Sequence, residues 1–242
     1  MKVHSLTDVG LVRTVNEDAC RTGLLGNIGA WAVVCDGMGG TKGGEVASQT
    51  AVACFEQQVQ EADIGAFEGE NMKRTLSTLI FHANEAIYNL AQQNEELRGM
   101  GTTVVAVFVL DNVAHIAHVG DSRAYLLHNG NVLQITTDHS MVQELIKNGD
   151  LTVEQAKVHP QKNIITRALG VNPVVEIDYE QIPLAPEDRI LICTDGLTNY
   201  IEQDQLRRFS DETDSEQLAQ MLIDLAKENG GGDNITVAIL DN

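Results

Sequence analysis

The sequence predicts an α+β domain in which antiparallel strands and amphipathic helices occupy separate stretches of the chain. Three short segments with strand character, at 102–110, 113–119 and 123–128, follow one another with connections too short for a helix, so they must pair antiparallel. Two long segments with helical spacing of apolar residues precede them, and another lies near the end. A Rossmann-type parallel sheet, which needs a helix between successive strands, is therefore disfavoured.

The first part of the chain is expected to form two strands and then two helices. Residues 3–9 and 30–35 are typical of strands, and the second apolar run ends abruptly at Asp36 and the glycine-rich residues after it. Helical spacing begins near 44, and a longer helical segment covers about 71–96. We expect these two helices to pack side by side.

The remaining elements follow from turn and capping signals. Asn129-Gly130 predicts a tight turn into a strand at 132–136. Short helices are expected between about 140 and 170, where Thr152 and Gln155 have the spacing of a capping box, and we interpret this segment as an inserted subdomain. Further strands are expected at 174–182, 189–193 and 235–240, with an amphipathic helix at 218–226.

The composition excludes several classes of protein. Thirty-five acidic residues against 16 basic ones give a net charge of −19, so a nucleic acid would be repelled. Neither a signal peptide nor a run long enough to span a membrane is evident, and we expect one cytoplasmic domain covering 1–242. The four cysteines form no CxxC pair, which disfavours a disulfide framework or a zinc site.

Four aspartates next to glycine carry the chemical signal. Asp36 and Asp195 each end an apolar strand in Asp-Gly, and Asp121 and Asp233 each follow a glycine near a strand end. A single Asp-Gly is usually a turn, but several carboxylates converging at strand ends would need cations between them. Without accompanying His or Cys ligands, the pattern favours Mg²⁺ or Mn²⁺, and no EF-hand loop supports calcium.

Two cations that share an aspartate would activate a water for in-line attack at phosphorus, so the pattern favours hydrolysis of a phosphate ester. Arg13, just after the first expected strand, is a candidate donor to phosphate oxygens. The residues alone leave this open, because Arg13 could equally be a solvated surface residue, and Glu17 and Asp18 could be polar loop residues.

The chain resembles the metal-dependent protein phosphatases of type 2C, the PPM family, along essentially its whole length. It is most similar to the compact, stand-alone bacterial Ser/Thr phosphatases of that family. The resemblance rests on an ordered set of motifs: GLVRTVNED, VVCDGMGG, GMGTT, HVGDSRAYLL, TTDHS, HPQKNIITRALG, ICTDGLTNYI and GGGDNITV.

The resemblance implies a four-layer α-β-β-α sandwich of two antiparallel sheets flanked by helices. It also implies two core Mn²⁺ or Mg²⁺ ions and a third, weaker ion. The implied roles are these: Asp36 bridges the core ions, Asp195 and Asp233 complete one, the Gly37 carbonyl binds the other, Glu17 and Asp18 act through water, Asp121 and Asp195 bind the third ion, Arg13 binds phosphate, and Asn234 supports the ligands.

The implied activity is hydrolysis of phosphoserine and phosphothreonine in proteins by a metal-bridged water or hydroxide. The implied partners are phosphorylated proteins, a Ser/Thr kinase and its substrates, and we expect a monomer. The segment at about 140–170 resembles the family's mobile flap, which affects substrate choice. Two alternatives stay open: a phosphatase for small phosphate esters, and a non-catalytic phosphoprotein-binding regulator on the same fold.

Two positions depart from the family pattern. Many eukaryotic relatives carry a histidine where this chain has Met38, and related bacterial members often have a histidine in place of Thr41, so the group that protonates the leaving oxygen is undetermined. The histidines elsewhere do not resolve this. We expect structural hydrogen bonding rather than catalysis for His115, His118, His139 and His159.

Overall fold

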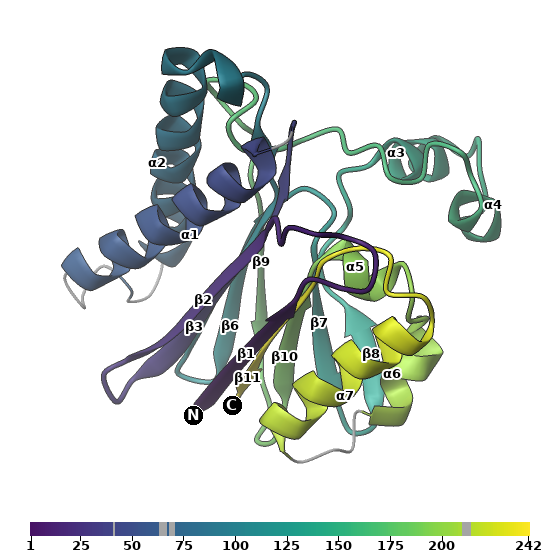
Figure 1. Cartoon of the computed structure of the whole chain (residues 1–242). Coiled ribbons are helices and arrows are strands. Elements are labelled where there is room, and N and C mark those ends of the chain that lie inside the picture. Colours follow the sequence, from purple (N-terminus) through teal and green to yellow (C-terminus); the bar gives the residue numbers. More distant parts are fainter. Residues whose placement is uncertain (41, 63–66, 68–70, 210–213) are drawn as a thin grey trace.

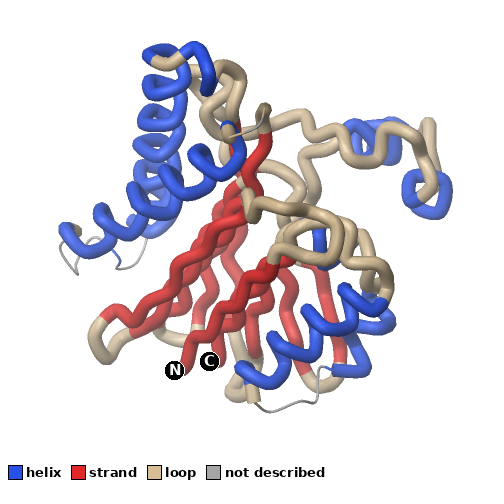
Figure 2. The backbone as a smooth tube through the Cα atoms, viewed as in Figure 1, coloured by secondary structure: helices blue, strands red, loops and turns tan. Residues whose placement is uncertain are grey.

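Two antiparallel sheets stack face to face, and helices cover both outer faces (Figure 1). The computed structural model describes residues 1–40, 42–62, 67, 71–209 and 214–242. Figure 2 shows the two strand layers enclosed by helices on either side. The predicted α+β class and the four-layer arrangement that the resemblance implied are therefore confirmed. None of the helices in the described part of the chain is long and apolar enough to cross a membrane.

One sheet has five strands in the order β1-β11-β10-β7-β8. Its strands are β1 (Lys2–Asp8), β7 (Arg123–His128), β8 (Asn131–Gln134), β10 (Arg189–Cys193) and β11 (Ile235–Asp241). The strands at the two ends of the chain lie together, because β1 pairs with β11 from Lys2 opposite Asp241 to Asp8 opposite Ile235. This pairing brings the loop after β1 next to the loop before β11.

The other sheet has six strands, five of them in the order β2-β3-β5-β6-β9. Its strands are β2 (Asp18–Leu25), β3 (Gly29–Met38), β4 (Gly101–Thr102), β5 (Val104–Leu110), β6 (Val113–Val119) and β9 (Asp178–Pro183). The short β4 pairs with the end of β3, where Gly37 lies opposite Thr102. The predicted meander is confirmed at β5 and β6. The expected pairing of 113–119 with 123–128 was wrong, because the chain changes sheet between them and β7 pairs with β10 and β8 instead.

Helices cover the outer face of each sheet. The helices are α1 (Gly43–Glu61), α2 (Asn71–Gln93), α3 (Met141–Asn148), α4 (Val153–Lys157), α5 (Asp195–Thr198), α6 (Gln203–Phe209) and α7 (Ser215–Glu228), with a 3₁₀ turn, η2, at Glu95–Leu97. The α1 and α2 helices pack side by side over the six-stranded sheet, as predicted, and α7 packs over β1 and β11. The capping box of α4 is present as predicted.

Three apolar layers hold the sandwich together. The layer between the sheets is built from small and β-branched side chains such as Val34, Val107 and Ile190, all fully buried. Larger side chains fill the outer layers, including Phe55 and Phe108 beneath α1 and α2, with ring centroids 6.0 Å apart. Because β5 is buried along its whole length, it shows a continuous apolar run rather than alternation.

Residues 140–170 contain α3 and α4 and project away from the sandwich (Figure 1). We call them the flap segment. Its two limbs are joined at the base by a bridge between Ser140 and Ile165, and Leu169 forms a further bridge to Thr102. The flap segment is therefore anchored to the sheets near the end of β3.

Several sequence expectations were wrong in detail. The expected strand at 30–35 continues through Asp36 to Met38, because β4 supplies a partner that the local pattern does not reveal. Strand β9 begins at Asp178 rather than at 174, because its pairing with β6 starts with Asp178 opposite His118. Strand β2 and helix α6 were not predicted, since β2 mixes polar and apolar residues without regular alternation and α6 is only seven residues long.

Candidate metal centre

The aspartates singled out in the sequence meet at one end of the sandwich. Asp36 lies near the end of β3, Asp195 begins α5 directly after β10, and Asp233 lies just before β11. Asp121 lies in the turn between β6 and β7, and Asp18 begins β2 opposite Asp36. The carboxyl of Asp36 is close enough to the other four to feel their charge. Aspartates from both sheets thus converge on one acidic site.

Asp18 is the most deeply enclosed of these carboxylates. Its side chain is 3% exposed, and its Oδ2 accepts hydrogen bonds from the hydroxyls of Thr194 at 2.9 Å and Thr236 at 2.7 Å. Burial, opposed by these hydrogen bonds and reinforced by Asp195, raises its pKa to about 7. A buried carboxylate with such a pKa is held beside like charges and would favour a cation.

The backbone around Asp36 is fixed by threonines. The Asp36 N–H donates to the Thr103 hydroxyl at 2.9 Å, and its carbonyl accepts from the Thr102 hydroxyl at 2.9 Å. Burial first, and then the charges of Asp18 and its neighbours, raise the Asp36 pKa well above its ordinary value. At Gly37 a Cβ atom would collide with backbone oxygens of Gly44 and Glu17, so only glycine fits this approach.

Asp195 and Asp121 form the next part of the acidic site. Burial and the charge of Asp233 raise the pKa of Asp195, which is in hydrogen-bond contact with Asp36 and accepts from Asn199 at 2.9 Å. Burial, followed by the charge of Asp195, raises the pKa of Asp121 to about 7. The charges of Asp195 and Asp121 therefore act on one another across the gap between β10 and the β6–β7 turn.

Arg13 lies against this cluster in a two-point ion pair with Asp233. Its Nε is 2.9 Å from Asp233 Oδ1, and its Nη2 donates to Oδ2 at 3.0 Å. The hydrogen bond to Asp233 raises the Arg13 pKa, and the charges of Glu17 and Asp36 act in the same direction. Burial raises the pKa of Glu17, while Arg13 opposes that shift. The Arg13 side chain is 48% exposed, so it lies at the protein surface while its guanidinium contacts the acidic site.

Asn234 organises the loop that carries Arg13 and Glu17. Its Oδ1 accepts from the Glu17 backbone N–H at 2.8 Å. Its Nδ2 donates to the carbonyls of Val9 and Val15, both at 3.0 Å. One buried side chain therefore satisfies three backbone groups of that loop, and this geometry agrees with the supporting place expected for Asn234.

A cavity of about 510 Å³ opens beside the acidic site, between the sandwich and the flap segment. Asp121 and Asp195 line it from the sandwich, and Val142, Ile146 and Ala156 line it from the flap segment. Across it, Lys157 of α4 donates to Glu202 at 2.6 Å. The cavity has a charged floor and a partly apolar wall.

The four histidines considered earlier make structural contacts. His115 bonds the Tyr179 hydroxyl at 2.7 Å and His118 bonds the Thr137 carbonyl at 2.9 Å. His139 accepts from the Gly120 N–H at 3.1 Å, and His159 accepts from the backbone of the flap segment. The position of Thr41 lies outside the described residues.

Sequence reasoning missed the residues that support the aspartates. Thr194 and Thr236 hold Asp18, and Thr102 and Thr103 hold Asp36, across separations of 66 to 218 residues. The only local signal was the threonine next to each aspartate or strand end, as in the Thr194-Asp195 pair. Such long-range contacts depend on strand register, which the sequence pattern alone does not specify.

The acidic site fits hard divalent cations. Its candidate ligands are all oxygens and come from both sheets, and burial together with the repulsion between the carboxylates raises several of their pKa values. Mg²⁺ or Mn²⁺ bound among them would relieve that repulsion. Fold and site together therefore define a protein that holds divalent cations at the ends of two stacked antiparallel sheets.

The chain belongs to the protein phosphatase 2C family, whose model matches residues 12–232. It is 39% identical to a serine/threonine phosphatase, stp, of Listeria innocua, over 100% of this chain and 96% of that protein. The crystal structure of Stp1 from Staphylococcus aureus superposes with a TM-score of 0.94 at 36% identity, covering 100% of this chain and 94% of that one. The PstP catalytic domain, solved with two manganese ions, gives a TM-score of 0.87 at 33% identity, covering 99% and 97%.

Proposed function

We propose that this protein is a Mn²⁺- or Mg²⁺-dependent phosphatase that removes phosphate from phosphoserine and phosphothreonine in proteins. The observation that carries the proposal is the convergence of five aspartates beside Arg13, two of which, Asp121 and Asp195, also line a cavity; the five are Asp18, Asp36, Asp121, Asp195 and Asp233. Membership of the protein phosphatase 2C family and full-length similarity to named bacterial Ser/Thr phosphatases support the same activity.

The ligand assignment is part of the proposal. Asp36 would be shared by two core ions, Asp195 and Asp233 would complete one of them, and the Gly37 carbonyl would serve the other. Glu17 and Asp18 would act through water, and Asp121 with Asp195 would hold a third, weaker ion. The raised pKa values of Asp36 and Asp195 support cation binding near these residues, because each buried carboxylate needs a nearby positive charge to stay ionised.

When bound, the divalent ions supply charge neutralisation and activation of a water for attack on phosphorus. The residues of the chain do the rest. Arg13 offers two N–H groups in a plane, a geometry that suits two oxygens of a phosphoryl group. To take that role it must release Asp233, which would be free to do so once a cation balances the aspartate.

A protein substrate is favoured over a small ester by the cavity next to Asp121 and Asp195. Its volume of about 510 Å³ could accept the peptide on either side of a phosphorylated side chain. The flap segment supplies one wall and would therefore influence substrate choice. A non-catalytic regulator is not favoured, because the carboxylates and Arg13 are all present and oriented toward one another.

A Ser/Thr kinase as functional counterpart, a monomeric state, the flap segment as a subdomain of a single domain, and a cytoplasmic location remain predictions from the sequence. Size-exclusion chromatography with light scattering would test the monomer.

The activity itself is tested by turnover of a phosphothreonine peptide with Mn²⁺, with Mg²⁺, and with a chelator. We expect turnover with either ion and none with the chelator. A panel of small phosphate esters run in parallel separates the two enzyme hypotheses. Turnover that persisted in the chelator would contradict the proposal.

A further inference from the structure

Three consecutive residues at the base of the flap segment bind the turn that carries Asp121 through hydrogen bonds and an ion pair. These residues, Thr137, Asp138 and His139, directly precede the first limb of the flap segment. The contacts join three pairs of residues: His118 Nε2 with the Thr137 carbonyl at 2.9 Å, Arg123 with Asp138 at 2.7 and 2.8 Å, and Gly120 with His139. Asp121 lies in the middle of this turn.

The contact between His139 and Gly120 is reciprocal. The Gly120 N–H donates to His139 Nδ1 at 3.1 Å, and the His139 N–H donates to the Gly120 carbonyl at 2.9 Å. Gly120 has a φ of 107°, and a Cβ there would collide with Thr103. Both polar backbone groups of Gly120, the residue before Asp121, are therefore bonded to His139, and Gly120 cannot rotate without breaking one of these bonds.

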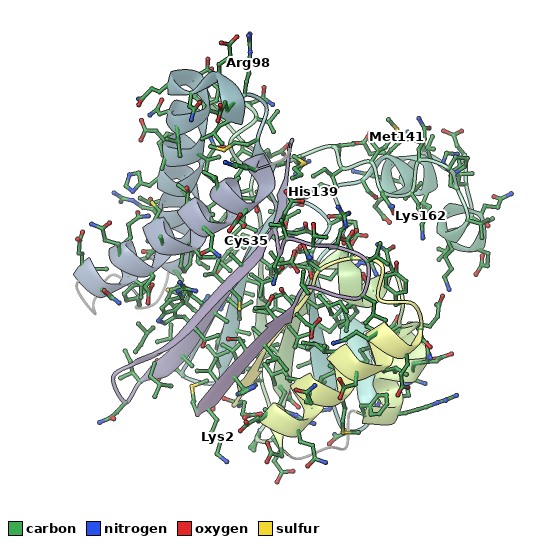
Figure 3. All side chains as sticks on the ribbon, in the orientation of Figure 1. Lys2, Cys35, Arg98, His139, Met141 and Lys162 are labelled. Atoms are coloured by element: carbon green, nitrogen blue, oxygen red, sulfur yellow. The ribbon has the colours of Figure 1, made fainter. Side chains whose placement is uncertain are left out.

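The other side of the His139 ring faces the far limb of the flap segment. Because Nδ1 accepts a hydrogen bond, the proton of the neutral ring lies on Nε2, which is 3.3 Å from Asp178 Oδ2. Arg167, near the end of the flap segment, contacts Asp178 at 2.8 Å and lies 3.2 Å from Nε2. Figure 3 shows His139 between the sheets and the segment that carries Met141 and Lys162.

The backbone reinforces this connection. The Thr166 N–H donates to the His139 carbonyl at 2.8 Å, so both limbs of the flap segment run past this residue. His139 is 6% exposed and makes contacts through its N–H, its carbonyl, Nδ1 to Gly120 and Nε2 to Asp178. A displacement of Arg167 or Thr166 would therefore move His139, whose ring is bonded to the turn that carries Asp121.

A metal ion could be imagined here instead. Among the described residues, His118, His139 and Asp178 have candidate ligand atoms within 4.8 Å of one another, and His118 Nδ1 is buried without a hydrogen-bond partner. However, the two rings are stacked, with centroids 4.7 Å apart and planes 15° apart, so their in-plane lone pairs do not converge. The guanidinium of Arg167 already neutralises Asp178. The geometry thus favours a fixed contact over an ion.

We propose that His139 is a positioning residue, which holds Asp121 in place for the third ion and links that placement to the flap segment through Arg167 and Asp178. The proposal rests on the proposed function, because the assignment of Asp121 to a third ion belongs to it. It adds a residue outside the acidic site on which that ion depends.

The first test uses the metal-free protein and needs no turnover. Amide hydrogen exchange, followed by NMR, should show Gly120 protected in the wild type and exchanging at least about tenfold faster in His139→Ala. His139→Asn keeps an acceptor near the Nδ1 position and should retain protection. His159→Ala, a histidine of the flap segment without contact to Gly120, is the matched control and should match the wild type.

The second test is a double-mutant cycle with Asp121→Ala. If His139 acts through Asp121, His139→Ala should lower kcat about tenfold in the wild type and leave kcat within about twofold in the Asp121→Ala background. It should also raise the Mn²⁺ concentration for half-maximal activity, while calorimetry shows the core ions bound as before. Equal losses in both backgrounds would overturn the proposal.

The outcomes distinguish the role of His139 from the proposed function. An unchanged Gly120 exchange rate in a folded His139→Ala variant would contradict the role of His139 even if the wild type hydrolyses phosphopeptide. Absence of metal-dependent turnover in the wild type sinks the proposed function, and with it the third ion. Zn²⁺ binding that is lost in both His118→Ala and Asp178→Ala would identify a metal site and overturn the positioning role. If His139→Ala fails to fold, loss of Gly120 protection in His139→Asn would overturn the proposal in its place.

Discussion

Arg13 and Asp233 are joined by two parallel contacts, at 2.9 and 3.0 Å, although 220 residues separate them in the chain. The pairing of β1 with β11 makes this possible, because it brings the loop after the first strand beside the loop before the last one. The ion pair therefore holds the arginine beside a proposed metal ligand, which it would leave to bind the phosphoryl group.

Replacing Arg13 by alanine should weaken substrate handling. We expect kcat/KM for a phosphopeptide to fall about 10- to 100-fold, mainly through KM, because the charged two-point contact to phosphate is lost. Arg13→Lys should recover only part of this, since an ammonium cannot form the planar two-point contact. Steady-state kinetics would measure both. Arg21→Ala, at an exposed arginine paired with Glu56, serves as the control, and a similar loss there would argue against a specific role for Arg13.

The metal-free protein should lose stability as the pH rises. The folded-state pKa values of Asp18 and Asp121 are raised from 3.8 to about 7, so their contribution is complete below pH 3.8 and is lost as the pH rises through 7. The melting temperature without metal should therefore be higher at pH 6.5 than at pH 8.0. The comparison stays at or above pH 6.5 because burial lowers the pKa of His115 and His139. The rise in stability with pH that this causes opposes the trend, and it is largest below their ordinary pKa of 6.5.

Added Mn²⁺ should reverse that order. An ion that binds only the folded protein stabilises it, and binding strengthens when the carboxylates are ionised. Calorimetric scans at the two pH values, with Mn²⁺ and with a chelator, would measure the effect. A free Mn²⁺ concentration 1,000 times its Kd should add about 4 kcal/mol to the free energy of unfolding. If the melting temperature of the metal-free protein increased from pH 6.5 to 8.0, the raised pKa values of Asp18 and Asp121 would be contradicted.

Asp36→Asn should separate stability from activity. The change removes one buried negative charge at almost constant volume, so the metal-free variant should be more stable than the wild type by on the order of 1–2 kcal/mol. Turnover should fall at least about 100-fold, because the shared ligand is lost. Chemical denaturation and kinetics would show the two effects. A variant that lost both stability and activity would indicate a structural role for Asp36 instead.

Asn234→Ala should loosen the loop that carries Arg13. Three backbone groups lose their partner inside the protein, and we expect a destabilisation of about 1–3 kcal/mol with a larger loss in kcat/KM than in metal affinity. Asn229→Ala, a side chain that bonds only the Tyr200 carbonyl, is a matched control with a smaller expected effect. Denaturant titration and calorimetry would compare them, and equal effects of the two variants would count against the loop-organising role.

Lys157→Ala should alter the handling of peptides but not of small esters. The contact between Lys157 of the flap segment and Glu202 spans the cavity beside Asp121, where we expect a peptide but not a small ester to extend. We expect KM for a phosphopeptide to change severalfold while kinetics with an aryl phosphate stay unchanged. Lys147→Ala, on the neighbouring helix α3, is the control. Parallel changes for both substrates would show that the cavity does not distinguish them.

The sequence predicted the main strands and helices and the aspartates of the acidic site, but not the residues that hold those aspartates in place. Apolar runs located β5, β6, β7, β10 and β11, and helical spacing located α1, α2 and α7. The aspartates were identified because each follows or precedes a strand end next to glycine. The residue pattern alone reached α+β, and the stacked arrangement of the sheets came from the family resemblance.

The missed features share one physical cause, which is dependence on distant partners. Strand β2 is an edge strand whose identity depends on pairing with β3, and β3 extends past Asp36 only because Thr102 lies opposite Gly37. Thr236 acquires its role from Asp18, 218 residues away. The expectation that His139 is structural rather than catalytic was made from the sequence, but its contact with Gly120 depends on where the flap segment returns to the sheets.

The division of the acidic site between the two sheets has a mechanical consequence. Asp18 and Asp36 come from the six-stranded sheet, whereas Asp195 and Asp233 adjoin strands of the five-stranded sheet. An ion bound between the two groups would join the two sheets at this end, and a chelator would remove that link. Digestion by proteases and forced unfolding should therefore be faster in the chelator than with Mn²⁺.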